Sequence, residues 1–298
     1  MTSRTRGTKV HDPEVGCCKR MKSRITGPLC DDLKASSFYD LEFKPALEKC
    51  IRLLGDREIE QIICYGLGEF VTGWLVEDSR YQLALLILMY QELKELGAPI
   101  KSYIEIYDPN FTEEDITVLS SFECPRFKII KENEQCARKI ATSSQDRCAL
   151  VYMPHMTREC YNNLLGANWS EEGLSKLVIL GNHFSSMNDD MIDSSYRRNF
   201  HYLNQLVENF PKDEKLSKSR KRGKRLASRQ TDKKQEDCQV GRALIELAVD
   251  NDKDYDGIFF CLAFHLLDKS WLRNNASKIE ESRIKDWCCE IVSTTKEI

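Results

Sequence analysis

The sequence predicts an α/β fold, in which a mostly parallel β-sheet carries helices on both faces. Five short apolar runs alternate with amphipathic stretches, and each run is closed by Gly, Pro, Asn or Asp. None of the runs alternates strictly between apolar and polar residues, which is typical of strands that are covered on both faces. The repeated order of strand and helix favours right-handed crossovers and parallel pairing. The predicted strands are residues 59–65, 103–107, 127–130, 149–153 and 177–180.

Helices are predicted in the gaps between these strands. The clearest covers residues 79–96 and is ended by the Gly-Ala-Pro sequence at 97–99. Thr112 is a predicted N-cap because three acidic residues follow it, where they face the positive end of a helix. Thr157 and Ser170 are predicted N-caps of two further helices.

A single α/β domain is predicted over residues 41–298. Residues 1–40 carry scattered Arg, Lys, Ser and Gly with little apolar periodicity, so we expect a mobile basic arm there. Between residues 214 and 234, ten Lys and Arg residues stand against two Asp and Glu residues. Such a block cannot bury itself, so we expect a disordered basic insertion at about 212–238. Apolar segments at 243–249, 258–267 and 279–291 then complete the domain.

Composition and charge argue against several classes of protein. The net charge of -3 gives no reason to expect direct nucleic-acid binding. The longest apolar stretch, 83–89, is far shorter than the ~20 residues that span a bilayer, so no membrane partner is expected. The thirteen cysteines include no Cys-x-x-Cys pair, which predicts buried apolar residues in a reducing cytoplasm and no metal site. The basic run 218–225 also fits a nuclear-import signal, with a plain solvated loop as the alternative.

Unusual residues follow four of the predicted strands. Because the carboxyl ends of parallel strands share one edge of a sheet, these residues form one candidate ligand-binding site. The candidates are Tyr65, Gly66, Gly68, Asp108, Pro154, His155, Asn182 and Phe184.

Gly66 and Gly68 suit a tight turn whose backbone N–H groups face a ligand such as a phosphate or a nucleoside cofactor. The full Gly-x-Gly-x-x-Gly pattern is absent, because Val71 stands at the third glycine position. Asp108 could accept hydrogen bonds from a ribose. The alternative is structural: a glycine turn followed by an Asp-Pro turn.

His155 and His183 are the candidate catalytic residues, since each ends a predicted core strand. An imidazole near neutrality can act as a general base, a proton donor or a metal ligand. No carboxylate with ligand spacing accompanies them, so binding of a polar ligand or capping of the strand ends remains the alternative. The sequence names no cofactor and no complete catalytic constellation, which leaves enzymatic activity open and disfavoured.

Six motifs, taken in order, resemble the sensitivity-to-red-light-reduced (SRR) family. They are Tyr-Gly-Leu-Gly-Glu-Phe at 65–70, Gln-Leu-Ala-Leu at 82–85, Tyr-Asp-Pro-Asn-Phe at 107–111, Tyr-Met-Pro-His at 152–155, Asn-Trp at 168–169 and Gly-Asn-His-Phe at 181–184. The resemblance implies a regulator in cytoplasm and nucleus, linked to a circadian-clock input pathway and to haem biosynthesis, with no settled activity. The family residues carried over are the eight ligand-site candidates. His183 is a departure, because the family carries a smaller, serine-like residue there.

Two hypotheses about function follow. The first is a non-enzymatic regulator whose Rossmann-like domain binds a small ligand or a protein partner at the strand ends. The second is an enzyme of methyltransferase type, with Gly66 and Gly68 around adenosylmethionine, Asp108 on its ribose and His155 near the acceptor. The fold by itself does not choose between them, because this architecture carries many unrelated functions.

Overall fold

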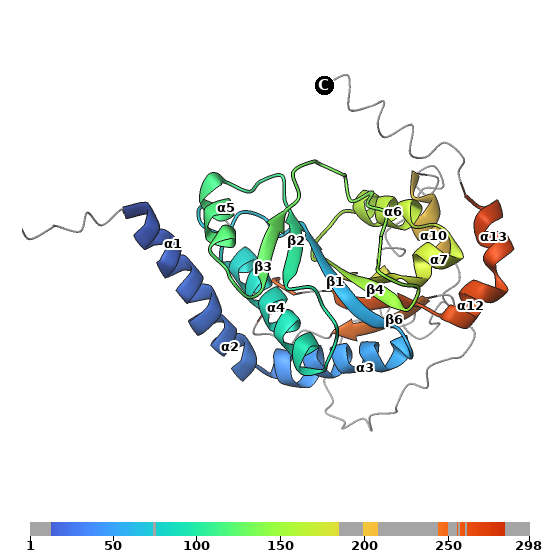
Figure 1. The fold of residues 1–298 in the computed structure, drawn as a ribbon, viewed down its shortest axis with the longest axis horizontal. Helices are drawn as coiled ribbons and strands as arrows, with labels where there is room; N and C mark the ends of the chain where they lie inside the picture. Colours follow the sequence, from blue (N-terminus) through green and yellow to red (C-terminus); the bar gives the residue numbers. More distant parts are fainter. Residues whose placement is uncertain are drawn as a thin grey trace, which may run out of the picture.

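A seven-stranded mixed sheet forms the centre of the structure, a computed structural model that describes residues 13–73, 76–184, 199–207, 244–249, 255, 257–259 and 261–283 (Figure 1). The strand order is β3-β2-β1-β4-β5-β7-β6. Strands β1 to β5 are parallel, whereas β7 runs antiparallel to both β5 and β6. The strands are β1 (Glu58–Tyr65), β2 (Tyr103–Tyr107), β3 (Arg126–Ile129), β4 (Arg147–Met153), β5 (Leu177–Asn182), β6 (Leu244–Val249) and β7 (Leu262–Leu267). The predicted α/β class with a mostly parallel sheet is confirmed.

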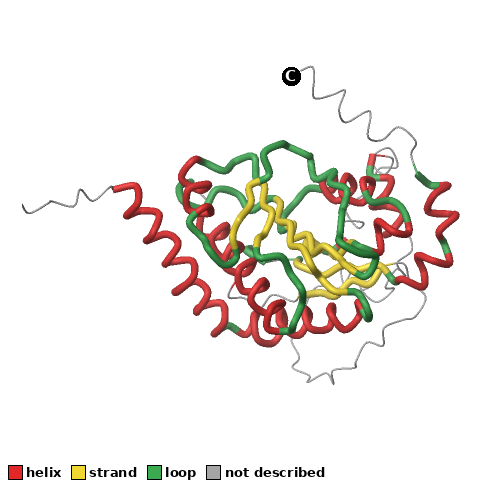
Figure 2. The backbone as a smooth tube through the Cα atoms, in the orientation of Figure 1, coloured by secondary structure: helices red, strands yellow, loops and turns green. Residues whose placement is uncertain are grey.

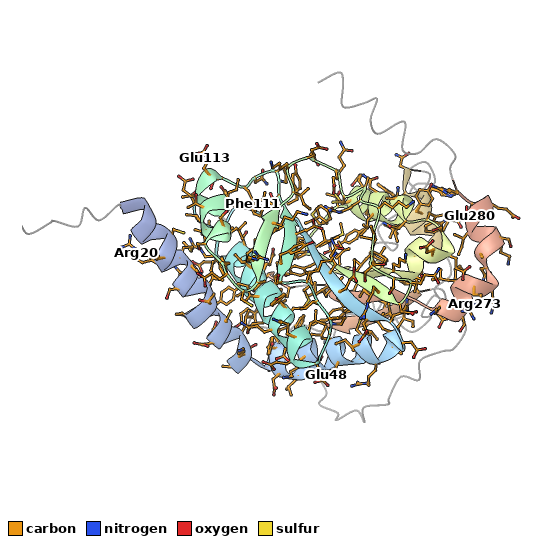
Figure 3. All side chains as sticks on the ribbon, in the orientation of Figure 1. Arg20, Glu48, Phe111, Glu113, Arg273 and Glu280 are labelled. Atoms are coloured by element: carbon orange, nitrogen blue, oxygen red, sulfur yellow. The ribbon has the colours of Figure 1, made fainter. Side chains whose placement is uncertain are left out.

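Helices surround this sheet (Figure 2). They are α1 (Pro13–Arg24), α2 (Cys30–Ala35), α3 (Lys44–Leu54), α4 (Val76–Glu95), α5 (Glu113–Ser120), α6 (Arg158–Ala167), α7 (Glu171–Ser175), α10 (His201–Val207), α12 (Lys269–Asn274) and α13 (Ala276–Glu281), with π-helical turns η1 (Ile25–Leu29) and η2 (Phe38–Phe43). Charged side chains such as Arg20, Glu113 and Glu280 lie on the outer helix surfaces (Figure 3). Among the helices of the described residues, none is both long and apolar enough to cross a bilayer.

The two faces of the sheet belong to two separate apolar clusters. Successive residues of a strand point to opposite faces, so Ile62 packs with α3 and α4 in the first cluster while Ile63 packs with α6 and α7 in the second. Both faces therefore carry helices, as predicted. Over β1 and β2, however, the second face is covered by the connection of residues 130–146, which contains no helix.

The predicted N-caps differ in how they work. Thr112 forms a capping box with Asp115, and the Ser170 hydroxyl accepts a hydrogen bond from the Gly173 N–H at 3.0 Å. Thr157 is the N-cap of α6, but its side chain makes no bond to the helix backbone. All three helices begin where the sequence predicts them, but the Thr157 hydroxyl does not bind the backbone of its helix.

The predicted mobile arm is wrong over residues 13–40. This segment is helical, and Ile25, Leu29 and Leu33 are buried against α4. These residues recur every four positions, so they share one side of a helix and pack into the first apolar cluster. A short helix gains most of its stability from such tertiary packing, which local composition does not reveal.

Parts of the sequence prediction lie outside the described residues. These are the first residues of the predicted arm, the basic insertion at 212–238 with its import-like run 218–225, and most of the segment 279–291. The single domain over 41–298 stays a prediction.

Candidate functional site

The strand order reverses between β1 and β4, the position where open α/β sheets bind ligands. The turn after β1 has Gly66 at φ +75° and Gly68 at φ +77°, which are left-handed conformations that favour glycine. The Asp108 carboxylate lies beside this turn, where Oδ2 accepts from the Gly68 N–H at 2.7 Å and Oδ1 from the Asn110 N–H at 2.8 Å. The structure thus brings Gly66, Gly68 and Asp108 together, with the carboxylate holding the turn.

Met156 fills the space above Gly66. A Cβ added to Gly66 would lie 2.0 Å from the Met156 sulfur, so any group that approaches this backbone has to displace the Met156 side chain. Met156 comes from the loop after β4 and is partly exposed. Met156 was not among the predicted site residues, and its one signal in the sequence is that it directly follows the Pro-His pair after β4.

His155 and Asn182 join the tips of β4 and β5. The His155 N–H donates to Asn182 Oδ1 at 2.9 Å, and its backbone is left-handed with φ +53°. The His155 ring nitrogen Nε2 lies 2.6 Å from the Ile258 carbonyl oxygen. The His183 ring nitrogen Nε2 lies 3.0 Å from the Leu262 carbonyl oxygen. The His155 imidazole therefore attaches the segment before β7 to the end of β4, and the His183 imidazole attaches the start of β7 to the end of β5.

Tyr65, Pro154 and Phe184 are buried and do not line an open edge. The Tyr65 hydroxyl donates to Glu134 Oε2 at 2.9 Å in the connection of residues 130–146. Phe184 stacks on His265 with ring centroids 3.9 Å apart, and its N–H donates to Glu246 Oε2 at 2.7 Å. Glu246 and His265 were not among the predicted site residues. Their contacts hold Phe184 in place after the end of β5.

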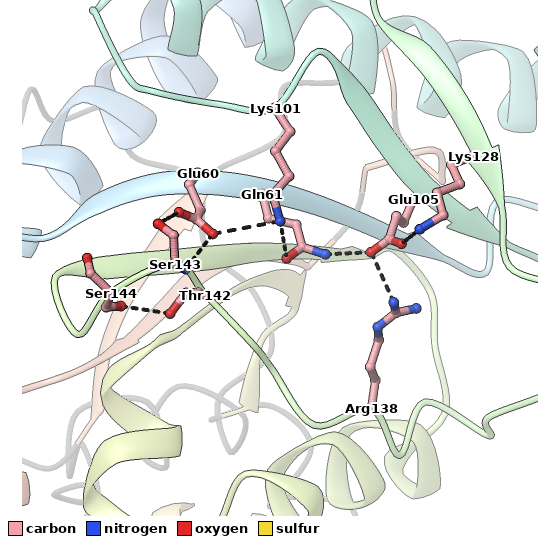
Figure 4. Close-up of polar contacts among 9 residues, drawn as sticks. All are labelled: Glu60, Gln61, Lys101, Glu105, Lys128, Arg138, Thr142, Ser143 and Ser144. Atoms are coloured by element: carbon pink, nitrogen blue, oxygen red, sulfur yellow. Dashed lines mark hydrogen bonds and ion pairs between the residues drawn. The ribbon is translucent and has the colours of Figure 1, made fainter.

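A polar network centred on the buried carboxylate of Glu105 crosses β1, β2 and β3 (Figure 4). Glu105, 3% exposed, accepts hydrogen bonds from Lys128 at 2.8 Å, from Arg138 at 3.1 Å and from Gln61. Burial raises the pKa of Glu105, but the Lys128 hydrogen bond and the charges of Arg138 and Lys128 outweigh it and hold the pKa below the usual value. The network anchors the connection of residues 130–146 through Arg138.

Replacing Glu105 with Gln is expected to lower the free energy of unfolding by about 1–3 kcal/mol at pH 7, because Arg138 and Lys128 lose a charged acceptor. The native pKa of Glu105 is depressed, so its stabilisation is present above the unfolded pKa of about 4.3 and is lost as the pH falls through the native pKa. Urea denaturation between neutral and acidic pH should therefore give a shallower pH dependence for Glu105→Gln than for the wild type. Glu58→Gln, at a half-exposed ion pair with Arg147, is the matched control. Parallel pH profiles for Glu105→Gln and the wild type would contradict the prediction.

Most thiols in the described part of the chain are buried. Cys18, Cys30, Cys50, Cys64, Cys136 and Cys148 are buried, and all of the described cysteines are free. Among the described residues, no group of three or more His, Cys, Asp or Glu side chains could hold a metal ion.

Comparison with known proteins gives a consistent result. Residues 36–266 match the model of the SRR1 domain family. The mouse "SRR1-like protein" is 33% identical over 141 residues, which cover 47% of this chain and 51% of the mouse protein. The Arabidopsis thaliana "Protein SENSITIVITY TO RED LIGHT REDUCED 1" is 31% identical over 178 residues, which cover 58% of each chain. The chain spans about half the length of the curated relatives it matches, and no solved structure matches it significantly.

Proposed function

Because this chain belongs to the SRR1 domain family, we propose that it is a non-enzymatic regulator that binds a small ligand or a protein partner at the carboxyl edge of its sheet. The resemblance drawn from the six sequence motifs is confirmed at the level of the family. The plant relative carries a name that refers to red-light sensitivity. A role in light or clock input and in haem biosynthesis, in cytoplasm and nucleus, is part of this proposal.

The observation that carries the proposal is the position of Met156 over Gly66 at the point where the strand order reverses. A ligand that approaches the Gly66 backbone has to displace the Met156 thioether. Methionine is unbranched and repacks easily, so this side chain can move without unfolding the strands. Ligand binding would then change the loop after β4, which carries His155 and its contact to Ile258. Such coupling between a ligand and a surface loop suits a regulator.

The polar side chains of the candidate site already have hydrogen-bond partners within the chain, which supports ligand binding over catalysis. Both Asp108 oxygens accept backbone N–H groups of the chain itself, and the imidazole of His155 lies against a carbonyl oxygen. A methyltransferase-type site would need Asp108 to turn toward a ribose and release the Gly68 N–H. The cost of leaving that N–H without an acceptor in a closed turn is about 1–3 kcal/mol.

We expect at least one compound among adenosylmethionine, adenosylhomocysteine, nicotinamide dinucleotides, nucleotides and haemin to raise the melting temperature of the wild type. Ligand at 100 times its dissociation constant stabilises the native state by about 2.7 kcal/mol, which shifts melting by a few degrees. Met156→Ala should bind the same compound more tightly, because no side chain has to leave Gly66. Met156→Leu, which keeps a side chain of similar volume there, is the matched control.

Two results would contradict this proposal. Equal affinity in Met156→Ala and in the wild type would place the ligand away from Gly66. Formation of a methylated product together with adenosylhomocysteine would make the protein an enzyme.

A further inference from the structure

Cys160 stands in the first turn of α6 and packs against the apolar cluster that contains Cys136. The Thr157 hydroxyl donates to the Cys160 sulfur at 3.6 Å, which explains why this N-cap residue does not cap the backbone. The Cys136 thiol, from the connection of residues 130–146, interacts with the same sulfur, because each of the two thiols shifts the pKa of the other. Cys160 is partly exposed, whereas Cys136 is buried. Two thiols that are 24 positions apart in the sequence therefore meet at the start of one helix.

The backbone of the connection holds Cys136 in this place. Gln135 and Cys136 are both left-handed, with φ +46° and φ +61°. Only a few per cent of non-glycine residues adopt this conformation, so two in succession require support from their surroundings. The support comes from a hydrogen bond of the Ala137 N–H to the Glu134 carbonyl oxygen at 2.7 Å and from Asn163 of α6, whose amide donates to the Gln135 carbonyl oxygen at 3.0 Å. The connection is thereby tied to α6 beside the thiols.

The two thiols differ in acidity, as an attacking thiol and its partner require. The interaction with Cys136 lowers the pKa of Cys160. Burial raises this pKa, the Thr157 hydroxyl lowers it again, and the result is a pKa of about 7. A position near a helix N-terminus also favours the thiolate. The hydrogen bond to Cys160 and burial raise the pKa of Cys136. By contrast, burial raises the pKa of Cys30 and of Cys148 to about 11.

We propose that Cys136 and Cys160 are a redox-sensitive thiol pair, which a hydroperoxide converts into a disulfide between the connection of residues 130–146 and α6. The Cys160 thiolate attacks one oxygen of the hydroperoxide, forms a sulfenic acid and releases hydroxide or an alkoxide. The Cys136 sulfur then attacks the Cys160 sulfur, and the sulfenic oxygen leaves as water with the Cys136 proton. For hydrogen peroxide, two thiols lose two electrons and two protons in total, while the peroxide becomes two waters. A dithiol reductant reverses the bond by exchange.

The disulfide would join two elements at the candidate edge. The connection of residues 130–146 carries Glu134 and Arg138, which bind Tyr65 and Glu105, and α6 begins directly after the loop of Met156. Figure 1 shows this connection running from β3 toward α6 and β4. The proposal of a thiol pair is independent of the proposed function, because no residue of the pair has to bind the ligand.

The full chain, treated with a small molar excess of hydrogen peroxide, alkylated and digested with trypsin, tests the proposal. The expected product joins the peptides 132–138 and 159–176 and is lighter by two hydrogen atoms than the two reduced peptides together. Dithiothreitol should restore both free peptides. Cys136→Ser should leave Cys160 as a sulfenic acid that a dimedone probe captures, whereas Cys124→Ser, at an exposed thiol, should leave the cross-link unchanged.

A second measurement tests the environment of Cys160 without oxidation. The rate of its alkylation by iodoacetamide should reach half of its maximum at a pH of about 7, below the 8.5 or so of an ordinary thiol. Thr157→Val and Cys136→Ala should each move this midpoint upward, because each removes an interaction that lowers the pKa of Cys160. The proposal is overturned if the cross-link joins other cysteines, if Cys160 stays reduced while Cys124 is oxidised, or if the midpoint does not respond to either variant.

Discussion

Replacing Asp115 with Ala is expected to lower the free energy of unfolding by about 3–5 kcal/mol, because several buried donors lose their acceptor at once. Asp115 is 0% exposed. Its Oδ1 accepts from the N–H groups of Phe70 and Val71 at 3.1 and 2.9 Å, and its Oδ2 accepts from the Thr112 N–H at 2.9 Å. The same residue therefore caps α5 and holds the end of the glycine loop after β1.

Urea denaturation followed by circular dichroism measures this loss. Glu113→Ala, at an exposed position of the same first turn, should cost less than about 0.5 kcal/mol and is the matched control. Asp115→Asn keeps one carbonyl oxygen for the two N–H groups of the glycine loop, so its loss should fall between the two. A loss for Asp115→Ala as small as that for Glu113→Ala would show that the loop does not depend on this carboxylate.

Replacing Phe38 with Ala is expected to cost about 3–5 kcal/mol, which is typical of a buried aromatic side chain. Phe38 is 0% exposed and stacks on Phe259, with ring centroids 4.8 Å apart and ring planes 1° from parallel. Tyr255 and Phe43 lie close to the same ring, at centroid distances of 5.9 and 6.3 Å. The ring thus joins the N-terminal helices to the segment that precedes β7, more than 200 positions away in the sequence.

The matched control is Leu41→Ala in the same turn, since Leu41 is 65% exposed and should cost less than about 0.5 kcal/mol. Thermal and urea unfolding of both variants give the comparison. Equal stability of Phe38→Ala and Leu41→Ala would mean that the N-terminal helices are not part of the folded core.

The strands and several helix starts were predictable because their causes are local. The run 103–107 is a strand with the predicted bounds, and Thr112 with Asp115 forms the capping box that its acidic neighbours suggest. β-branched and aromatic runs, Pro and Gly stops and N-cap side chains act within a few residues of one another. The N-terminal helices were missed because their apolar residues are few and gain stability only through tertiary contacts, including those with α4, which lies some 50 positions further along the chain.

Within the candidate site, the sequence by itself determined that a glycine turn, an Asp-Pro turn and two histidines stand at the strand ends. The tertiary structure decided what these residues do. Asp108 accepts from Gly68 at a separation of 40 positions, and His155 meets Ile258 at a separation of 103. Met156 above Gly66 and Cys136 beside Cys160 also depend on which strands are neighbours. Hydrogen bonds and packing contacts act only over a few ångströms, so the role of each polar group follows from the strand order and not from its place in the sequence.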